Sequence, residues 1–393
     1  MNKNKIKKNK CVYCGDSPIN HSFSYFSSIV SMILDPLFTR MTRWVPRFAV
    51  NGAEGVLKGI FNILYFFKII RLSDDIEKSL SLRTKVAWQE AKKRNIEMKQ
   101  VVFLGKHTDN FRAKVKGKYI YFDSLPIPSK PLDSDGKWDD KFFLKQNFHK
   151  NNIPVPACAK IPLSKLKRKT LFERFTKPII VKPREGSRGR HTTTNIRTYH
   201  EFEKAYFLAK EICPQVIIEE HLSGYVCRAT CIDGKLVGFY RAEPAFVIGD
   251  GEKTIEELIK EKNINRLERV KEITINTELQ EQIKREGYDI KDVLENDKRI
   301  ELSHRIGRYF GGITKEMLDE INPSFIPILE KASKITNLHL VGFDCIVPNP
   351  EDAQNNQKWG IIECNTLPFI DLHYFALTGK PKDIAGMIWD LNK

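Results

Sequence analysis

The sequence lacks an apolar run long enough to cross a bilayer, which takes about 20 residues. Its densest apolar segment, "IFNILYFFKII", covers only residues 60–70. The first residues, "MNKNKIKKNK", also lack the early apolar core and the small-residue cleavage site of a signal peptide. We therefore expect a cytoplasmic protein without a membrane-spanning helix.

The sequence has fewer acidic residues than basic ones. The chain has 65 Lys and Arg residues against 49 Asp and Glu residues, which gives a formal net charge of +16. Such a surplus suits nucleic acid, an anionic membrane surface or anionic substrates. A coding bias toward lysine produces the same surplus, so the charge alone does not select a class of partner.

Cysteine is present but not arranged as a disulfide framework. Two of the eight cysteines form the motif "CVYC" at Cys11 and Cys14. A structural zinc site needs four ligands. His21 is the next candidate and no fourth ligand is evident, so the sequence leaves a metal site here undecided. The other cysteines lie mostly in apolar, strand-like surroundings, which favours reduced, buried thiols: Cys213, Cys227, Cys231, Cys345 and Cys364.

Composition and periodicity divide the chain into four stretches. Residues 1–22 are interpreted as a basic, disordered tail, and residues 23–75 as a helical region. That region either packs on the rest of the protein or lies as a basic amphipathic segment on an anionic membrane. Residues 76–135 are expected to form a small α/β unit that ends in the proline-rich "LPIPSKPLDSDGK". From residue 136 to 393, hairpin-like strands and segregated helices predict an α+β architecture.

Two apolar strands near the C-terminal end each carry an acid. They are "GFDCIV" and "GIIECNT", separated by a polar loop, so we expect them to pair as a hairpin. Glu363 and Asn365 are two residues apart and face the same side of their strand. Asp344 can meet them from the neighbouring strand. Oxygen ligands of this kind suit Mg²⁺ that bridges nucleotide phosphates.

The segment "VKPREGSRGRHTTTN", residues 181–195, is typical of a phosphate-binding loop, although it is not a Walker A motif. Lys182 can neutralise phosphate charge while backbone N–H groups and hydroxyls, including that of Ser187, hold phosphate oxygens. Gly186 and Gly189 allow a lid that closes over a nucleotide and excludes water. Further along, "VIIEEHLSG" places Glu219 for an adenine amino group, and the backbone of Leu222 could read the ring.

Taken together, these segments resemble those of the ATP-grasp carboxylate–amine ligases. Four segments match in order over about residues 138–393: "DKFFLKQNFHKNNIPVP", "PIIVKPREGSRG", "IIEEHLSG" and "GFDCIV…IIECNTLP". The resemblance implies an ATP-grasp fold at 136–393, in which two α+β subdomains clasp ATP, preceded by a pre-ATP-grasp-like unit at 76–135. Within the family, "RGRHTTTNI" and "RYFGGITKEM" resemble the ATP-grasp part of cyanophycin synthetase. That enzyme's Mur-ligase-like domain has no counterpart here, so we do not expect its polymerisation reaction.

The resemblance also implies roles for matching residues. Arg228 and Lys182 would be catalytic, with Arg228 clamping an acylphosphate or a substrate carboxylate; an ordinary strand ion pair is the alternative for this arginine. Two Mg²⁺ ions, with Mn²⁺ as an alternative, would bind at Asp344, Glu363 and Asn365. The implied ATP-binding residues are Lys141, Lys182, Glu185, Gly186, Ser187, Gly189, Glu219, Glu220 and Leu222.

Two departures from the family pattern limit what carries over. Val226 stands where the family usually places an acid that binds ribose. The segment "LSHRIGRYFGG" is out of register with the corresponding arginine and asparagine of cyanophycin synthetase. The identity of the substrates is therefore not transferred.

The implied activity is ATP-dependent amide bond formation between a carboxylate and an amine, with release of ADP and phosphate. The substrates would be small molecules or peptides, and a protein acceptor is a variant of the same hypothesis. The alternative is a non-catalytic ATP-binding protein that docks on nucleic acid or anionic membrane through its basic N-terminal region. Of these partners we do not expect nucleic acid, whereas peripheral membrane contact and a homo-oligomer stay open.

Overall fold

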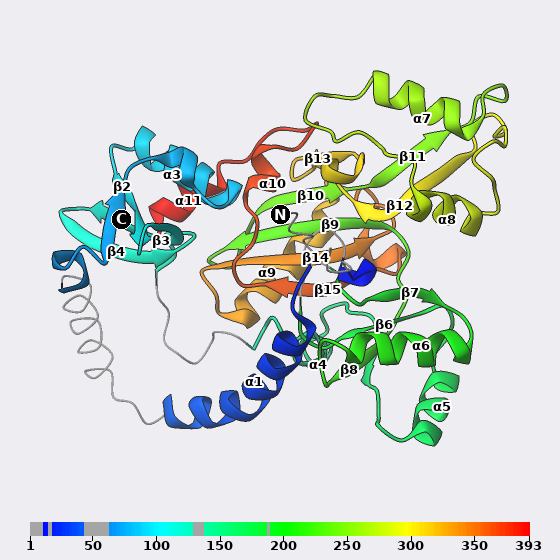
Figure 1. Ribbon diagram of the computed structural model, residues 1–393, viewed down its shortest axis with the longest axis horizontal. Coiled ribbons are helices and arrows are strands. Elements are labelled where there is room, and N and C mark those ends of the chain that lie inside the picture. The colour runs from blue at the N-terminus through cyan, green and yellow to red at the C-terminus, as the bar shows by residue number, and fades with distance from the viewer. Residues whose placement is uncertain (1–10, 15–17, 43–62, 129–136, 187–188) are drawn as a thin grey trace, which may run out of the picture.

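The computed structural model describes residues 11–14, 18–42, 63–128, 137–186 and 189–393. These residues form four sheets, all built from antiparallel strand pairs, with helices packed against them (Figure 1). Within these ranges, no helix combines the length and the apolar character needed to cross a membrane. The expected mixed α and β architecture is confirmed.

The central sheet is the scaffold for the candidate site. Its strand order is β13-β10-β9-β14-β15, with β13 at Thr314–Glu316, β10 at Lys235–Ala242, β9 at Tyr225–Ile232, β14 at Leu340–Val347 and β15 at Gly360–Asn365. Helices α4 (Lys141–Lys150) and α9 (Ile326–Thr336) pack against it. One face is buried in an apolar core that includes Phe148, Phe239, Phe325, Leu329 and Phe343. The other face is therefore left for polar side chains.

A second sheet carries the glycine-rich loop. Its order is β5-β8-β6-β7, with β5 at Cys158–Lys160, β8 at Val216–Glu220, β6 at Ile179–Pro183 and β7 at Thr193–Ile196. Helices α5 (Lys165–Arg174) and α6 (Tyr199–Lys210) share its apolar core through Phe172 and Phe202. A capping box between Thr198 and Glu201 begins α6 and satisfies two backbone donors. The loop between β6 and β7 thus leaves and re-enters a well-packed subdomain.

A two-stranded sheet projects from the central sheet. It consists of β11 (Pro244–Ile248) and β12 (Arg299–Ile306), covered by α7 (Ile255–Ile264) and α8 (Thr277–Arg285). β10 and β11 are separated by the single residue Glu243. The ladder of the central sheet ends there because Pro244 has no N–H to continue it.

The fourth sheet corrects the expected boundary of the helical region. Its order is β1-β2-β3-β4: Ile70–Ser73, Glu97–Phe103, Lys106–Val115 and Lys118–Asp123. The stretch 23–75 is thus not all helical, because β1 pairs with β2 and buries Ile70. Helix α3 (Leu82–Lys93) covers this sheet together with α11 (Ile384–Asp390). Trp389 of α11 donates its Nε1–H to the carbonyl of Ala87 at 2.8 Å, so the C-terminal helix packs on this unit.

The N-terminal stretch is also more structured than a tail. A short 3₁₀ helix, η1, spans Val12–Cys14, and α1 spans His21–Thr42. Asn20 explains the start of α1, because its side-chain oxygen accepts a hydrogen bond from the N–H of Phe23 at 3.1 Å. The remaining elements are short: η2 (Ile76–Lys78), η3 (Arg308–Phe310), η4 (Pro323–Phe325), η5 (Gln354–Asn356) and α10 (Asp371–Tyr374).

Candidate active site

The expected hairpin of acid-bearing strands is confirmed. β14 and β15 pair antiparallel, and the register sets Asp344 opposite Glu363 and Gly342 opposite Asn365. On its other side, β14 pairs with β9, which sets Asp344 opposite Arg228. The neighbours Phe343, Cys345 and Cys364 point into the core. Because strand side chains alternate, the polar groups emerge together on the opposite face of the sheet.

Arg228 makes a charged pair with one of the expected metal ligands. Its Nη2 donates to Oδ2 of Asp344 at 2.8 Å, and its Nε donates to Oδ1. Burial lowers the pKa of Arg228, but the adjacent carboxylate outweighs it and the net pKa is raised, so the guanidinium stays charged. Its Nη1 is buried and has no hydrogen-bond partner among the described residues. A buried donor left over in this way points to a further acceptor at this position.

Lys141 connects the acids with the glycine-rich loop. It is the first residue of α4, where Asp140 caps the helix through the N–H groups of Phe142 and Phe143. The Nζ of Lys141 lies 3.4 Å from Oε1 of Glu363 and donates to the carbonyl of Gly186 at 2.5 Å. A cation is thereby held between the loop and the acidic strand.

Glu219 belongs to a buried charge cluster behind the loop. Its carboxylate is 1% exposed and lies 2.8 Å from Nζ of Lys182 and 2.7 Å from Nζ of Lys145. Burial alone would raise the pKa of Glu219, but the two lysines lower it. The adenine contact that the sequence suggested for Glu219 stays a prediction. Glu219 holds the ammonium group of Lys182 in place.

Lys145 was missed by sequence reasoning. Its position four residues after Lys141 was the available signal, because side chains at i and i+4 share one face of a helix. Burial lowers its pKa to about 8, against the opposing effect of Glu219, and its Nζ also donates to the carbonyl of Ile362 at 2.8 Å. Asp139 was missed as well. It accepts from Thr366 Oγ1 at 3.0 Å, and burial raises its pKa.

The loop glycines have the conformations that a tight loop requires. Gly186 has φ +117° and Gly189 has φ +64°, values that residues with a Cβ rarely adopt. Ser187 lies outside the described residues. Arg184, at the start of the loop, donates to both carboxylate oxygens of Asp140, its Nε at 2.8 and 2.9 Å. This arginine therefore fastens the start of the loop to Asp140, the residue that caps α4.

Three other expected nucleotide-binding residues lie at the edge of this group. Glu185 is half-buried in the loop. Glu220, at the end of β8, forms an ion pair with the exposed Lys358 and accepts from the N–H of Ala157 at 3.5 Å. Leu222 follows β8, and its side chain is buried near Gly360 of β15. The structure thus puts the connection from β8 to β9 beside the acidic strands.

The chain is similar to several known proteins. No family model matches the chain. Cyanophycin synthetase of Geminocystis herdmanii (strain PCC 6308) is 31% identical over 263 residues, which is 64% of this chain and 30% of that protein. The glutathione biosynthesis bifunctional protein GshAB of Clostridium perfringens (strain 13 / Type A) is 29% identical over 262 residues, 64% of this chain and 34% of that protein. The chain thus spans about a third of the length of these curated relatives.

A solved structure gives the fold. The bifunctional glutathione synthetase from Pasteurella multocida aligns with a TM-score of 0.57 and 20% identity, covering 80% of this chain and 43% of that chain. The chain has the ATP-grasp fold. The resemblance to ATP-grasp ligases that the sequence motifs indicated is confirmed over the ATP-grasp region.

The donors of the ATP-grasp site suit a nucleotide triphosphate with a divalent cation. Asp344, Glu363 and Asn365 offer carboxylate and amide oxygens on one face, which are ligands that Mg²⁺ accepts. Each carboxylate faces a cation of the protein: Asp344 faces Arg228, and Glu363 faces Lys141. The unused Nη1 of Arg228 shows that the group has capacity for another anion. These residues therefore fit the chemistry of a bound phosphate–metal group.

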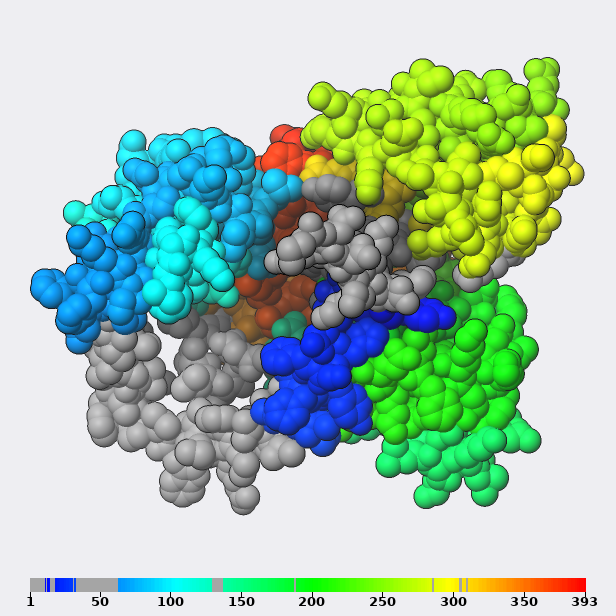
Figure 2. Space-filling model, in the orientation of Figure 1, coloured from blue at the N-terminus to red at the C-terminus, as the bar shows by residue number. Residues whose placement is uncertain are grey.

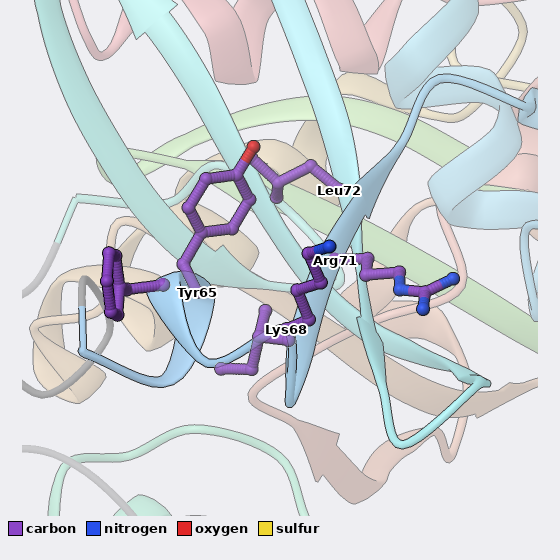
Figure 3. A pocket seen from close by; sticks show the side chains of 6 residues that line it. Tyr65, Lys68, Arg71 and Leu72 are labelled. Atoms are coloured by element: carbon purple, nitrogen blue, oxygen red, sulfur yellow. The ribbon is translucent and has the colours of Figure 1, made fainter.

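A surface pocket elsewhere shares none of these residues. It lies around β1 and is lined by Tyr65, Phe66, Lys68, Ile70, Arg71 and Leu72 (Figure 3). In Figure 3 the side chain of Arg71 points away from that of Tyr65. It contains no carboxylate, so it does not offer the ligands that a metal-nucleotide requires.

Proposed function

We propose that the chain is an ATP-dependent ligase that joins a carboxylate to an amine. The observation that carries this proposal is a set of three cations beside a glycine-rich loop. Lys141 and Arg228 pair with the carboxylates of β15 and β14, and Lys182 is held next to them by Glu219 of β8. Transfer of a phosphoryl group spreads negative charge over its oxygens, and fixed cations stabilise that charge. A carboxylate would take the γ-phosphate of ATP as an acylphosphate. An amine would then attack the carbonyl carbon and release phosphate.

Each cation has a distinct task in this proposal. Lys182, held by Glu219, would contact the ATP phosphates from β6, and Lys141 would contact them from α4. Arg228 would use Nη1 on the acylphosphate or the substrate carboxylate while Asp344 fixes its orientation, because the arginine fork suits both anions. The loop glycines Gly186 and Gly189, together with Ser187, would close over the phosphates and exclude water.

The metal ligands follow from the donor set. We propose that Asp344, Glu363 and Asn365 hold Mg²⁺, as two ions, with Mn²⁺ as a substitute. Bound there, the metal would neutralise charge on the phosphate oxygens. Adenine would lie along the connection after β8, near Glu185, Glu220 and the backbone of Leu222. Ribose contacts would lack the usual carboxylate, because Val226 occupies that position.

The substrates are proposed only by class: an amino acid or a peptide as the carboxylate, and an amine. Two relatives whose names state a product, cyanophycin synthetase and the glutathione biosynthesis protein, support this class. The test is release of ADP and phosphate from Mg²⁺-ATP by the full chain across pairs of amino acids and short peptides. Release that requires one acid and one amine, with a product of the mass expected for the amide, supports the proposal. Absence of release with every pair, despite ATP binding, contradicts ligation of small substrates.

We also propose peripheral contact with anionic membranes for a cytoplasmic protein. Four apolar side chains ahead of β1 are 50–79% exposed, and Lys68 follows them: Ile63, Tyr65, Phe66 and Phe67. Aromatic groups beside a cation are typical of segments that lie on a membrane surface. Sedimentation with phosphatidylserine vesicles tests this contact. Substituting Phe66 and Phe67 by Ser should reduce the bound fraction, whereas equal binding by the variant would contradict it.

A further inference from the structure

Four potential metal ligands meet at the N-terminal edge of the loop subdomain. Their ligand atoms all lie within 4.8 Å of one another, and we call them the Cys₂His₂ cluster: Cys11, Cys14, His21 and His191. Cys11 directly precedes η1, Cys14 ends it, and His21 is the first residue of α1. His191 follows the glycine-rich loop, 180 residues after Cys11. The ligand that the motif "CVYC" lacked in the sequence is therefore supplied by the fold.

The separations match a tetrahedral site. The Nε2 of His191 lies 3.6 Å from Sγ of Cys11 and 3.5 Å from Sγ of Cys14, and Nε2 of His21 lies 3.2 Å from Sγ of Cys14. In tetrahedral zinc with bonds of about 2.3 Å to sulfur and about 2.0 Å to nitrogen, sulfur and nitrogen ligands stand about 3.5 Å apart. The four side chains are thus already arranged around a position for one ion.

Outer contacts orient both imidazole rings. The Nδ1 of His191 lies 2.7 Å from the carbonyl oxygen of Leu208, to which it can donate, and this leaves Nε2 to face the sulfurs. The Nδ1 of His21 lies 3.5 Å from a carboxylate oxygen of Glu211. Histidines that bind zinc usually donate their second N–H to a carbonyl or a carboxylate, as these two can. An accidental cluster of polar side chains does not require such contacts.

Burial also indicates a closed, structural site. Cys14 is 4% exposed and His191 is 0% exposed, whereas Cys11 and His21 are half-buried. Four protein ligands leave no position for a substrate, which distinguishes structural zinc from catalytic zinc. Two thiolates with two imidazoles favour zinc over Mg²⁺ or Ca²⁺, which prefer oxygen ligands.

We propose that the Cys₂His₂ cluster binds one structural zinc ion that fastens the N-terminal segment to the end of the glycine-rich loop. Direct contacts run along the same interface. The N–H of His191 donates to the carbonyl of Tyr13 at 3.1 Å, and Ser24 of α1 donates to the carbonyl of Ile212 at 3.2 Å. Figure 2 shows the N-terminal residues, in blue, lying against the loop subdomain, in green. Zinc would thus fix the point where the loop re-enters β7.

Metal content is the direct test, and it does not depend on ligase activity. The full chain is purified without chelators, and its metals are measured by inductively coupled plasma mass spectrometry. We expect one zinc per chain, and cobalt reconstitution should give the intense sulfur-to-metal charge-transfer absorption of thiolate ligands. A protein that holds no zinc as purified and takes up none when zinc is added under reducing conditions would overturn the proposal.

Matched variants locate the site. Cys11→Ser and His191→Gln should each lower the zinc content at least tenfold in a buffer with a competing chelator. Cys213→Ala and His200→Gln, which change a cysteine and a histidine of the same subdomain outside the cluster, should keep one zinc per chain. Cys11→His preserves a ligand and should retain zinc, which separates ligand loss from misfolding. Full zinc content in both Cys11→Ser and His191→Gln would contradict this assignment, as would a Cys11–Cys14 disulfide in protein freshly prepared under reducing conditions.

Discussion

The described residues contain two groups of candidate metal ligands. The groups differ in the chemical hardness of their ligand atoms, in the elements that supply them and in the number of protein ligands. The oxygen group, Asp344, Glu363 and Asn365, lies on two adjacent strands, and its carboxylates face cations of the protein. The Cys₂His₂ cluster draws three ligands from the N-terminal segment and one, His191, from the far end of the loop. It offers four protein ligands. In the roles we propose, the first group would share its ions with a substrate, whereas the second would hold one ion permanently.

This difference also separates what each group does for the glycine-rich loop. At the front of the loop, Lys141 donates to the carbonyl of Gly186 and also lies near Glu363. At its far end, His191 belongs to the cluster. The loop is therefore connected to the oxygen group on one side and to the proposed zinc on the other. Changes to the first should abolish chemistry, whereas changes to the second should alter loop position and stability.

The largest expected effect is on the oxygen group. Glu363→Gln keeps the shape of the side chain but removes the charge that binds the metal. We expect turnover to fall on the order of 10³-fold, which corresponds to about 4 kcal/mol of transition-state stabilisation. Steady-state ADP release by wild type and variant measures it, with circular dichroism to show that the fold is kept.

The matched control is Asp352→Asn, in the exposed loop between the same two strands. It removes a carboxylate from the same hairpin without touching the oxygen group, and its turnover should stay within twofold of wild type. Near-normal turnover in Glu363→Gln would mean that the oxygen group does not take part in the reaction. The proposed difference in role between the two metal groups would then be wrong.

The next effect concerns the support of the oxygen group. Glu219→Ala leaves the ammonium groups of Lys145 and Lys182 buried without their carboxylate. Removing one partner of a buried charge cluster costs about 3–5 kcal/mol. Urea unfolding should show this loss in the free energy of unfolding. Glu220→Ala, next along β8 and paired with an exposed lysine, should lose less than about 1 kcal/mol. Equal losses in the two variants would show that the buried charge cluster contributes no more to the free energy of unfolding than an exposed ion pair does.

The two groups of metal ligands also differ in how much of each could be predicted from the sequence. Glu363 and Asn365 are two residues apart on an apolar strand, and Asp344 lies on the strand before it, so periodicity alone brings them to one face. The cluster needs His191, whose sequence neighbours predict a phosphate loop. No spacing rule connects it with Cys11, because the contact exists only after α1 docks on the loop subdomain.

A similar limit explains the errors in the fold. The run at residues 60–70 is apolar enough to extend a helix, yet Ile70 begins β1 because β2 offers an unpaired edge. The sequence motif placed Glu219 on an apolar strand but did not indicate its two lysine partners, Lys145 and Lys182, because only the packing of α4 against β15 brings Lys145 there. Local pattern predicts elements and faces, whereas pairing partners come from tertiary structure.

A smaller effect should follow from removing zinc. A chelator selective for zinc over Mg²⁺ should lower the midpoint of thermal unfolding by several degrees, since a ligand bound only to the folded state stabilises it. The KM for ATP should rise several-fold with kcat changed less than tenfold, because the loop loses its far anchor but keeps Lys141. Readdition of zinc should restore both quantities. A loss of kcat as large as that of Glu363→Gln would mean that the Cys₂His₂ cluster takes part in the reaction, and would contradict a purely structural role for the zinc.

The smallest expected effect is a pH dependence of stability that arises from Lys145, behind the glycine-rich loop, and not from the Cys₂His₂ cluster. Burial lowers the pKa of Lys145 from 10.5 to about 8 in the folded protein. Between these values the unfolded chain binds more protons than the folded one, so stability rises with pH in this window, and the full penalty applies below about pH 8. From pH 7.5 to 9.5 the free energy of unfolding of wild type should gain about 1 to 2 kcal/mol relative to Lys145→Met.

The gain should be the same with and without zinc, because Lys145 contacts Glu219 and Ile362 and no member of the cluster. Urea titrations at the two pH values measure it. A gain that vanished in the zinc-free protein would show that the two groups are energetically coupled through the loop.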